Sequence, residues 1–190
     1  MGARAEAAEH TADRIIDAML ERLRTTPYEH VRLEDVATDA GVTGQTVIRR
    51  FGGKAALMVA TVERELGRIV RAREGAARAT SRETIGALVA HYERYGALIL
   101  KTYAEAPLVP GLPEIVARGR AFHVDWCRRA FRRHPAPAAS DETIVQAQVI
   151  ALCDATTWRI LRFDGGLDPA GTVRALEELL LPLVDRPDGP

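Results

Sequence analysis

The chain has 190 residues, 47% of them hydrophobic, which is enough for one sizeable core or for two modest cores that share an interface. Its 26 basic and 26 acidic residues give a formal net charge of zero, so global basicity offers no argument for nucleic-acid binding. A charged fraction of 27% with this hydrophobic content excludes a disordered polyelectrolyte.

The sequence shows no apolar leader near its start and no run of about 18 uncharged apolar residues. Its two cysteines, Cys127 and Cys153, fit a reduced compartment and are expected to lie in the core. We therefore expect a cytoplasmic protein that has no membrane partner.

Apolar residues recur at intervals of three and four, and sustained alternation is missing, so we predict an all-α protein. The first helix is expected from about Ala8 to Arg24. A short second helix fits "LEDVATDAG", with acidic residues in its first turn and Gly41 directly after its last turn.

Capping and proline signals divide the rest of the chain into longer helices. "TSRE" has the form of a capping box, Pro113 suits a first helical turn, and Asp168 precedes a proline that can open a helix. The expected helices run from Lys54 to about Ala79, from Thr80 to about Pro107, from about Pro113 to "RRHPAPAAS", from Ser140 to Phe163, and from Asp168 to Val184.

The stretch "GVTGQTVIRRFGGK", residues 41–54, predicts a tight turn followed by a second short helix, which completes a helix-turn-helix. On a helical wheel Val47 and Phe51 fall together and should seal the core of this module. Side chains on the other side are of the types that bind base edges, thymine methyl groups or phosphate, namely Gln45, Thr46, Ile48 and Arg49.

Both helix starts in this region should attract anions. Thr43 is expected to cap the short helix, whose first N–H groups face outward, and Lys54 lies at the start of the next helix. No acidic residue occurs from Ala40 to Val62, as a surface that meets a polyanion requires.

The segment "LEDVATDAGVTGQTVIRRFGGKAALM" resembles the DNA-binding signature of the TetR family of transcriptional repressors, over about the first 60 residues. The matching positions are Val36, Ala37, Ala40, Gly41, Val42, Thr43, Val47, Phe51, Lys54 and Leu57.

The chain departs from the family pattern at four positions. Ile48 replaces a tyrosine that contacts the DNA backbone, Arg50 replaces a histidine, Arg32 replaces a capping threonine or serine, and Gly44 has no side chain for base reading. The resemblance implies a DNA-binding set of Arg32, Thr43, Gly44, Gln45, Thr46, Ile48, Arg49, Arg50 and Lys54.

The same resemblance implies a homodimer that binds a near-palindromic operator in double-stranded DNA. The last two long helices are the expected dimer interface, although an intramolecular core would give a similar apolar pattern. We expect a DNA-binding domain at residues 1–54, a regulatory and dimerisation domain at 55–184 and a flexible tail at 185–190.

The larger domain is expected to hold an unidentified small-molecule effector in a mostly apolar pocket. Core packing is the alternative explanation for each aromatic residue there. The expected lining residues are Tyr92, Tyr95, Tyr103, Phe122, His123, Trp126, Trp158 and Phe163.

Catalysis is not expected, and no metal or other cofactor is implied. "HVDWC" puts His123 and Cys127 on one helical face but Asp125 on another, so these residues do not form a triad. The arginines at positions 64, 68 and 71 are expected to form a solvated face. Two functions remain: a sequence-specific repressor that a ligand releases from its operator, and a small-molecule-binding or enzymatic protein in which the helix-turn-helix is only structural.

Overall fold

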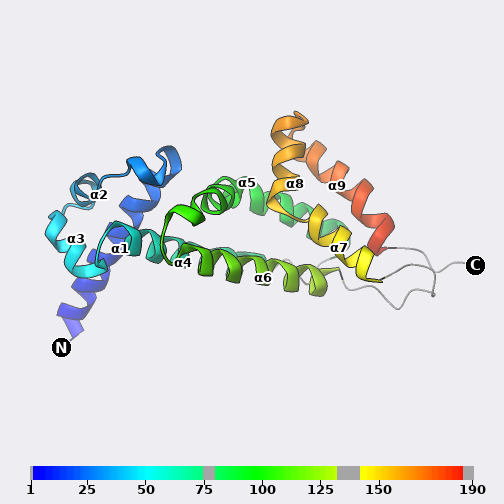
Figure 1. The fold of residues 1–190 in the computed structure, drawn as a ribbon. Helices are drawn as coiled ribbons and strands as arrows, with labels where there is room; N and C mark the ends of the chain where they lie inside the picture. Colours follow the sequence, from blue (N-terminus) through cyan, green and yellow to red (C-terminus); the bar gives the residue numbers. More distant parts are fainter. Residues whose placement is uncertain (1, 75–79, 132–141, 186–190) are drawn as a thin grey trace, which may run out of the picture. The chain divides into compact units, whose positions relative to one another are not determined.

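The computed structural model describes residues 2–74, 80–131 and 142–185, and this part of the chain contains no strand (Figure 1). The prediction of an all-α protein is confirmed. In chain order the elements are α1 (Gly2–Thr25), η1 (Tyr28–His30), α2 (Leu33–Asp39), α3 (Gly44–Phe51), α4 (Lys54–Glu74), α5 (Ser81–Glu105), η3 (Ala106–Leu108), α6 (Leu112–Ala130), α7 (Glu142–Leu152), α8 (Ala155–Arg159), η4 (Ile160–Asp164) and α9 (Pro169–Val184).

Two of the predicted helix starts have the expected caps. The backbone N–H of Thr80 donates to Glu83 Oε2 at 2.9 Å, and the backbone N–H of Glu83 donates to Thr80 Oγ1 at 3.3 Å, which is a capping box. Asp168 Oδ1 accepts from the N–H of Gly171 at 2.6 Å, directly before Pro169 opens α9.

The predicted helix from Ser140 to Phe163 is wrong in its continuity. Ser140 lies outside the described residues, and α7 ends at Leu152. Asp154 has an extended backbone, and its carboxylate accepts from the N–H of Thr156 at 2.8 Å, so it caps a new helix, α8. When an aspartate side chain bonds a backbone N–H, the chain can leave the helix at that point. The spacing of apolar residues does not show whether such a bond forms.

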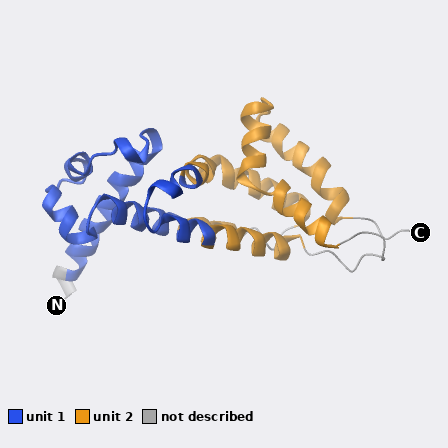
Figure 2. Ribbon diagram, in the orientation of Figure 1, with its two compact units in different colours: residues 1–67, 102–117 blue, residues 68–101, 118–190 orange. Residues whose placement is uncertain are grey.

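By compactness the chain forms two units, residues 1–67 with 102–117 and residues 68–101 with 118–190 (Figure 2). This division cuts α4, α5 and α6. The functional boundary expected between residues 54 and 55 remains a prediction. Of the expected tail, Asp185 is described, and its carboxylate accepts a hydrogen bond from Ser81 Oγ at 2.6 Å.

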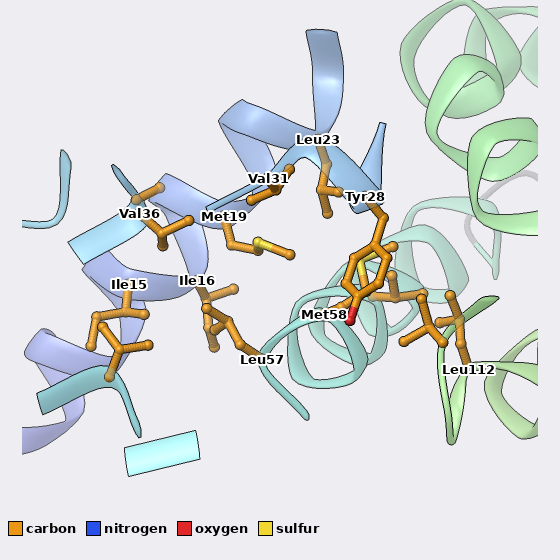
Figure 3. Close-up of a cluster of buried hydrophobic side chains, with 14 of the residues drawn as sticks. Ile15, Ile16, Met19, Leu23, Tyr28, Val31, Val36, Leu57, Met58 and Leu112 are labelled. Carbon is orange, nitrogen blue, oxygen red and sulfur yellow. The ribbon is translucent and has the colours of Figure 1, made fainter. Parts of the chain in front are cut away.

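The core of the first unit joins α1, α2, α3 and α4. Figure 3 shows Ile15 and Met19 of α1, Val36 of α2 and Leu57 of α4 directed into one cluster. Val47 of α3 is fully buried in the same cluster, as the helical wheel predicts. The helix-turn-helix, formed by α2 and α3, is therefore held by apolar packing on α1 and α4.

The core of the second unit combines α5, α6, α7, α8 and α9. Both cysteines are fully buried there, which confirms the prediction that they are core residues. Trp158 of α8 lies against α5 at Gly96, where a β-carbon would overlap the indole ring. In the described part of the chain, none of the helices is long and apolar enough for a membrane span.

Candidate DNA-binding and effector sites

The turn between α2 and α3 is a Schellman motif centred on Gly41. Gly41 has a φ of 64°, its N–H donates to the carbonyl of Thr38 at 3.0 Å, and the N–H of Val42 donates to the carbonyl of Ala37 at 2.9 Å. A side chain at position 41 would be strained in this left-handed conformation. The glycine thus ends α2 and sets the chain path into α3.

The short helix α3 is capped at both ends. Thr43 Oγ1 accepts from the N–H of Thr46 at 3.2 Å, and the two threonine hydroxyls lie 3.0 Å apart. Gly52, with a φ of 87°, ends the helix. The predicted N-cap is confirmed, and the hydroxyl of Thr46 takes part in it, which leaves its methyl group as the freer contact for a base.

The exposed face of α3 carries no negative charge. Gln45, Ile48, Arg49 and Arg50 are exposed, and Ile48 exposes 53% of its surface. Arg32, directly before α2, is also exposed and makes no capping hydrogen bond. Two turns of helix therefore present an amide, an aliphatic side chain and two guanidinium groups to solvent.

An ion pair fastens α2 to α1. Arg22 Nε and Nη2 donate to the two carboxylate oxygens of Asp39 at 2.6 and 3.0 Å, and Arg22 Nη1 lies 3.4 Å from Asp35. The hydrogen bond from Arg22 lowers the pKa of Asp39. This two-point contact fixes the orientation of α2 on α1, and through the turn it constrains α3.

Lys54 has a structural role that its position at a helix start does not reveal. Its Nζ donates to the carbonyls of Tyr28, Glu29 and Val31 at 3.1, 3.3 and 3.1 Å, and it lies 4.4 Å from the centre of the Tyr28 ring. These three bonds use all three donors of the ammonium group. Lys54 can contact phosphate only by giving up one of them.

Replacing Lys54 with Met should lower the free energy of unfolding by about 2 kcal/mol, because the carbonyls of Tyr28, Glu29 and Val31 lose a charged donor. Urea unfolding followed by circular dichroism measures this change. The exposed Arg50 provides the matched control, since Arg50→Met should shift the same free energy by less than about 0.5 kcal/mol. Equal effects of the two substitutions would contradict the structural role of Lys54.

Arg64 does not belong to a solvated face of α4, as the sequence predicted. Its side chain is only 17% exposed, and it pairs with Asp17 at 2.5 Å and with Asp13 at 3.6 Å. The two acidic residues project from α1, a partnership that the sequence of α4 alone does not show. Arg64 therefore ties α4 to α1.

Of the expected effector-site residues, Tyr103 lies in the first unit and the others lie in the second. Tyr92 is buried, donates its hydroxyl to the carbonyl of Cys153 at 2.7 Å, and has its ring 5.9 Å from that of Trp158. Trp158 Nε1 in turn donates to Glu93 Oε1 at 2.8 Å. These contacts give both rings a fixed place in the core.

The remaining expected residues differ in burial. Tyr95 and Phe122 are partly exposed, while Phe163 exposes 63% of its surface and meets the Trp158 ring edge-on. His123 is buried, with Nε2 3.1 Å from the carbonyl of Ile150.

His123 and Cys127 contact each other, as their spacing predicts. Both ring nitrogens of His123 lie 3.8 Å from Cys127 Sγ, whereas Asp125 is exposed and pairs with Arg129. Cys153 and, to a smaller extent, His123 lower the pKa of Cys127, against the effect of burial. His123, Cys127 and Asp125 therefore do not form a catalytic triad, because the carboxylate pairs with Arg129 and not with the histidine.

Two buried polar residues of the second unit were missed by the sequence analysis. Arg73, in the last turn of α4, is 5% exposed, and its guanidinium carbon lies 4.0 Å from the centre of the Trp126 ring. Trp126 Nε1 donates to the Arg73 carbonyl at 3.1 Å. The position of Arg73 in the sequence is consistent with burial, because it follows Ile69 by one helical turn and so lies on the apolar side of α4.

The second missed residue is His91 of α5, which is 8% exposed and contacts the rings of Tyr92 and Tyr95 at 5.4 and 5.1 Å between centroids. Burial, with a smaller contribution from the Arg73 charge, lowers the pKa of His91 from 6.5 to about 3. The imidazole is therefore neutral at physiological pH.

Acidification should destabilise the protein through His91. The unfolded chain takes up a proton near pH 6.5 and the folded chain only near pH 3, so the stabilising effect is present above pH 6.5 and falls as the pH drops. Between pH 6.5 and 5, the free energy of unfolding should decrease by about 1.5 kcal/mol more in the wild type than in His91→Phe. Urea titrations at several pH values measure this difference. His10→Gln, at an exposed histidine, is the control and should behave like the wild type.

Apolar side chains are exposed on α7 and α9, which pack against each other. Ile144 exposes 58% and Leu179 46% of its surface. Smaller apolar residues one turn away from these two are also exposed or half-buried, namely Ala147, Ala175 and Pro182. The outer sides of both helices therefore carry exposed apolar side chains.

The chain was compared with protein families, with curated proteins and with solved structures. Residues 15–61 match the model of the bacterial regulatory proteins of the tetR family. No curated protein matches the chain.

Solved structures match over nearly the full length. FadR from Bacillus subtilis, in complex with stearoyl-CoA, shares 17% identity over 90% of this chain and 96% of that chain, with a TM-score of 0.65. A putative transcriptional regulator from Pseudomonas aeruginosa shares 17% identity over 92% and 90%, with a TM-score of 0.70. NalD, the secondary repressor of the MexAB-OprM multidrug efflux pump in the same organism, shares 18% over 93% and 97%, with a TM-score of 0.62.

At these identities the solved structures show a common fold. The family model matches the segment that carries the helix-turn-helix, and the remaining helices follow the fold of known regulators. Residues 15–61 therefore match the DNA-binding domain of the tetR family of bacterial regulatory proteins, and the chain as a whole shares the fold of the solved regulators.

Proposed function

We propose that this regulator is a homodimeric repressor that binds a near-palindromic operator and leaves it when a small-molecule effector binds the second unit. The observation that carries the proposal is the acid-free, exposed face of α3, which presents Gln45, Ile48, Arg49 and Arg50. No catalytic activity is part of the proposal.

The expected DNA contacts divide into two classes. Gln45 and Arg49 have side chains that can pair with base edges, and Ile48 can pack on a thymine methyl group. Arg32, Arg50 and the N-terminal end of α3 at Thr43 and Gly44 are suited to phosphate. Thr46 supports the cap of α3 and offers its methyl group.

Dimerisation is proposed through α7 and α9, because their exposed apolar residues need a partner surface. A second copy of the chain fits best, since a two-fold arrangement would place two recognition helices on the two halves of a palindrome.

The effector is proposed to bind in the second unit, where Tyr92, Trp126 and Trp158 are gathered with the buried polar residues His91 and Arg73. A protein of the same fold, FadR from Bacillus subtilis, binds stearoyl-CoA. An effector with an apolar body therefore suits both the fold and the residues of this unit.

Selection of bound duplexes from a random DNA pool tests the proposal. The wild type should enrich one near-palindromic sequence, whereas a triple variant with alanine at positions 45, 49 and 50 should enrich none. A wild type that enriches no sequence would favour the alternative function, a helical small-molecule-binding protein with a structural helix-turn-helix.

A further inference from the structure

Arg73 is a buried cation with two guanidinium nitrogens that have no hydrogen-bond partner among the described residues. It is 5% exposed, and its Nε and Nη2 atoms have no hydrogen-bond partner. Contact with the Trp126 ring at 4.0 Å and the C-terminal end of α4 both favour a positive charge there. Neither supplies the acceptors that two buried N–H groups need.

The unbonded atoms lie on one edge of the guanidinium group, and this chain shows what that edge binds. Arg22 uses Nε and Nη2 to hold both oxygens of Asp39. Arg162 uses Nε and Nη2 to hold both oxygens of Glu93, at 2.6 and 3.1 Å. In both pairs the planar edge meets a planar carboxylate with two parallel bonds, which is the favoured geometry for this partner.

Three carboxylates of the second unit have other partners. Glu74 accepts from Arg129 at 2.8 Å, Glu93 accepts from Arg162 and Trp158, and Asp154 caps α8. Among the residues that the structure describes, none bonds Nε or Nη2 of Arg73. The described residues thus leave this edge open to a carboxylate of another molecule.

A second unbonded group lies close by. His91 Nε2 is buried without a hydrogen-bond partner, and the charge of Arg73 acts on this imidazole. The Tyr92 ring contacts both residues, at 5.6 Å from the Arg73 guanidinium carbon and 5.4 Å from the His91 ring. Two polar groups thus share an aromatic surrounding formed by α4, α5 and α6.

We propose that Arg73 binds a carboxylate group of the effector through Nε and Nη2, with His91 as an additional hydrogen-bonding group. This inference rests on the proposed effector-binding role of the second unit, and it names the chemical class of the ligand: an organic acid whose apolar part lies against Trp126 and Tyr92. Binding would neutralise the buried charge and satisfy its two donors.

Sodium formate, the smallest carboxylate, tests the subsite without requiring the complete effector. Thermal unfolding and tryptophan fluorescence of the full chain are measured in formate and in sodium chloride of equal ionic strength. Formate should raise the melting temperature along a saturation curve, whereas chloride should not. Arg71→Met, at an exposed arginine of the same helical turn, should leave this effect unchanged.

Two variants of Arg73 make the test specific. Arg73→Met should abolish the formate effect without lowering the melting temperature of the ligand-free protein, because an apolar side chain replaces an unpaired buried charge. Arg73→Lys keeps the positive charge but cannot form two parallel hydrogen bonds to one carboxylate, so the affinity of this variant for formate should fall at least about tenfold.

Three results would overturn the inference: equal melting temperatures in formate and chloride, saturable formate binding by Arg73→Met, or tighter binding of inorganic phosphate than of formate, which would assign the site to phosphate. Because the assay contains no DNA, its failure leaves the repressor proposal intact. Failure of DNA binding likewise leaves the formate result unchanged.

Discussion

Replacing Leu179 with Glu should convert the proposed dimer into a monomer and lower operator affinity at least about 100-fold. Leu179 exposes 46% of its surface on α9, beside the half-buried Ala175 and the exposed Pro182. In a two-fold interface each Leu179 becomes buried, so the substitution places two carboxylates in an apolar contact. A monomer binds only one half-site. It therefore loses the gain in affinity that arises when the first contact holds the second subunit close to the second half-site.

Sedimentation velocity measures the mass, and fluorescence anisotropy measures the affinity for the selected duplex. Arg174→Glu is the matched control, because Arg174 is exposed on α9 but points away from Leu179 on the helical wheel. It should leave both the mass and the affinity unchanged. A wild-type protein that sediments as a monomer at the concentrations at which it binds DNA would contradict this interface.

Replacing Gln45 with Ala should lower the preference for operator over random DNA by about 1 to 3 kcal/mol, which is about 5- to 150-fold. Gln45 is exposed in the first turn of α3, and its amide can form two bonds with one base. The loss should appear mainly on the operator, because random DNA offers no matching base edge. Competition titrations with operator and random duplexes measure the ratio.

Arg32→Ala provides the contrast. An exposed cation outside α3 should contact phosphate, so its removal should weaken binding to operator and to random DNA alike. It should also make the slope of log affinity against log salt less negative by about one. Equal losses of preference in Gln45→Ala and Arg32→Ala would show that the division into base and phosphate contacts is wrong.

The fold could be predicted from the sequence where local chemistry decides it. The Thr43 and Thr80 caps, the Gly41 turn and the inward position of Val47 each depend on residues within one or two helical turns. The break at Asp154 could not be predicted, because it depends on whether one carboxylate bonds the backbone or faces solvent.

The candidate sites were predictable only in part, because the roles of charged residues depend on distant partners. Lys54 bonds carbonyls more than 20 positions earlier, and Arg64 pairs with residues of α1. The sequence did not indicate the burial of Arg73, because an arginine that follows an apolar stripe is usually interpreted as a solvated residue at the end of a helix. Its burial under Trp126 is a tertiary contact between α4 and α6.

The salt dependence of DNA affinity tests the central claim most directly. Fluorescence anisotropy with the selected duplex, repeated from about 50 to 200 mM salt, should give nanomolar to micromolar binding that weakens steeply. The reason is that Arg32, Arg50 and the α3 N-terminus are proposed to replace counterions on phosphate. A plot of log affinity against log salt should be linear and steeply negative. No binding at 50 mM salt, or an affinity that does not change with salt, would contradict the account.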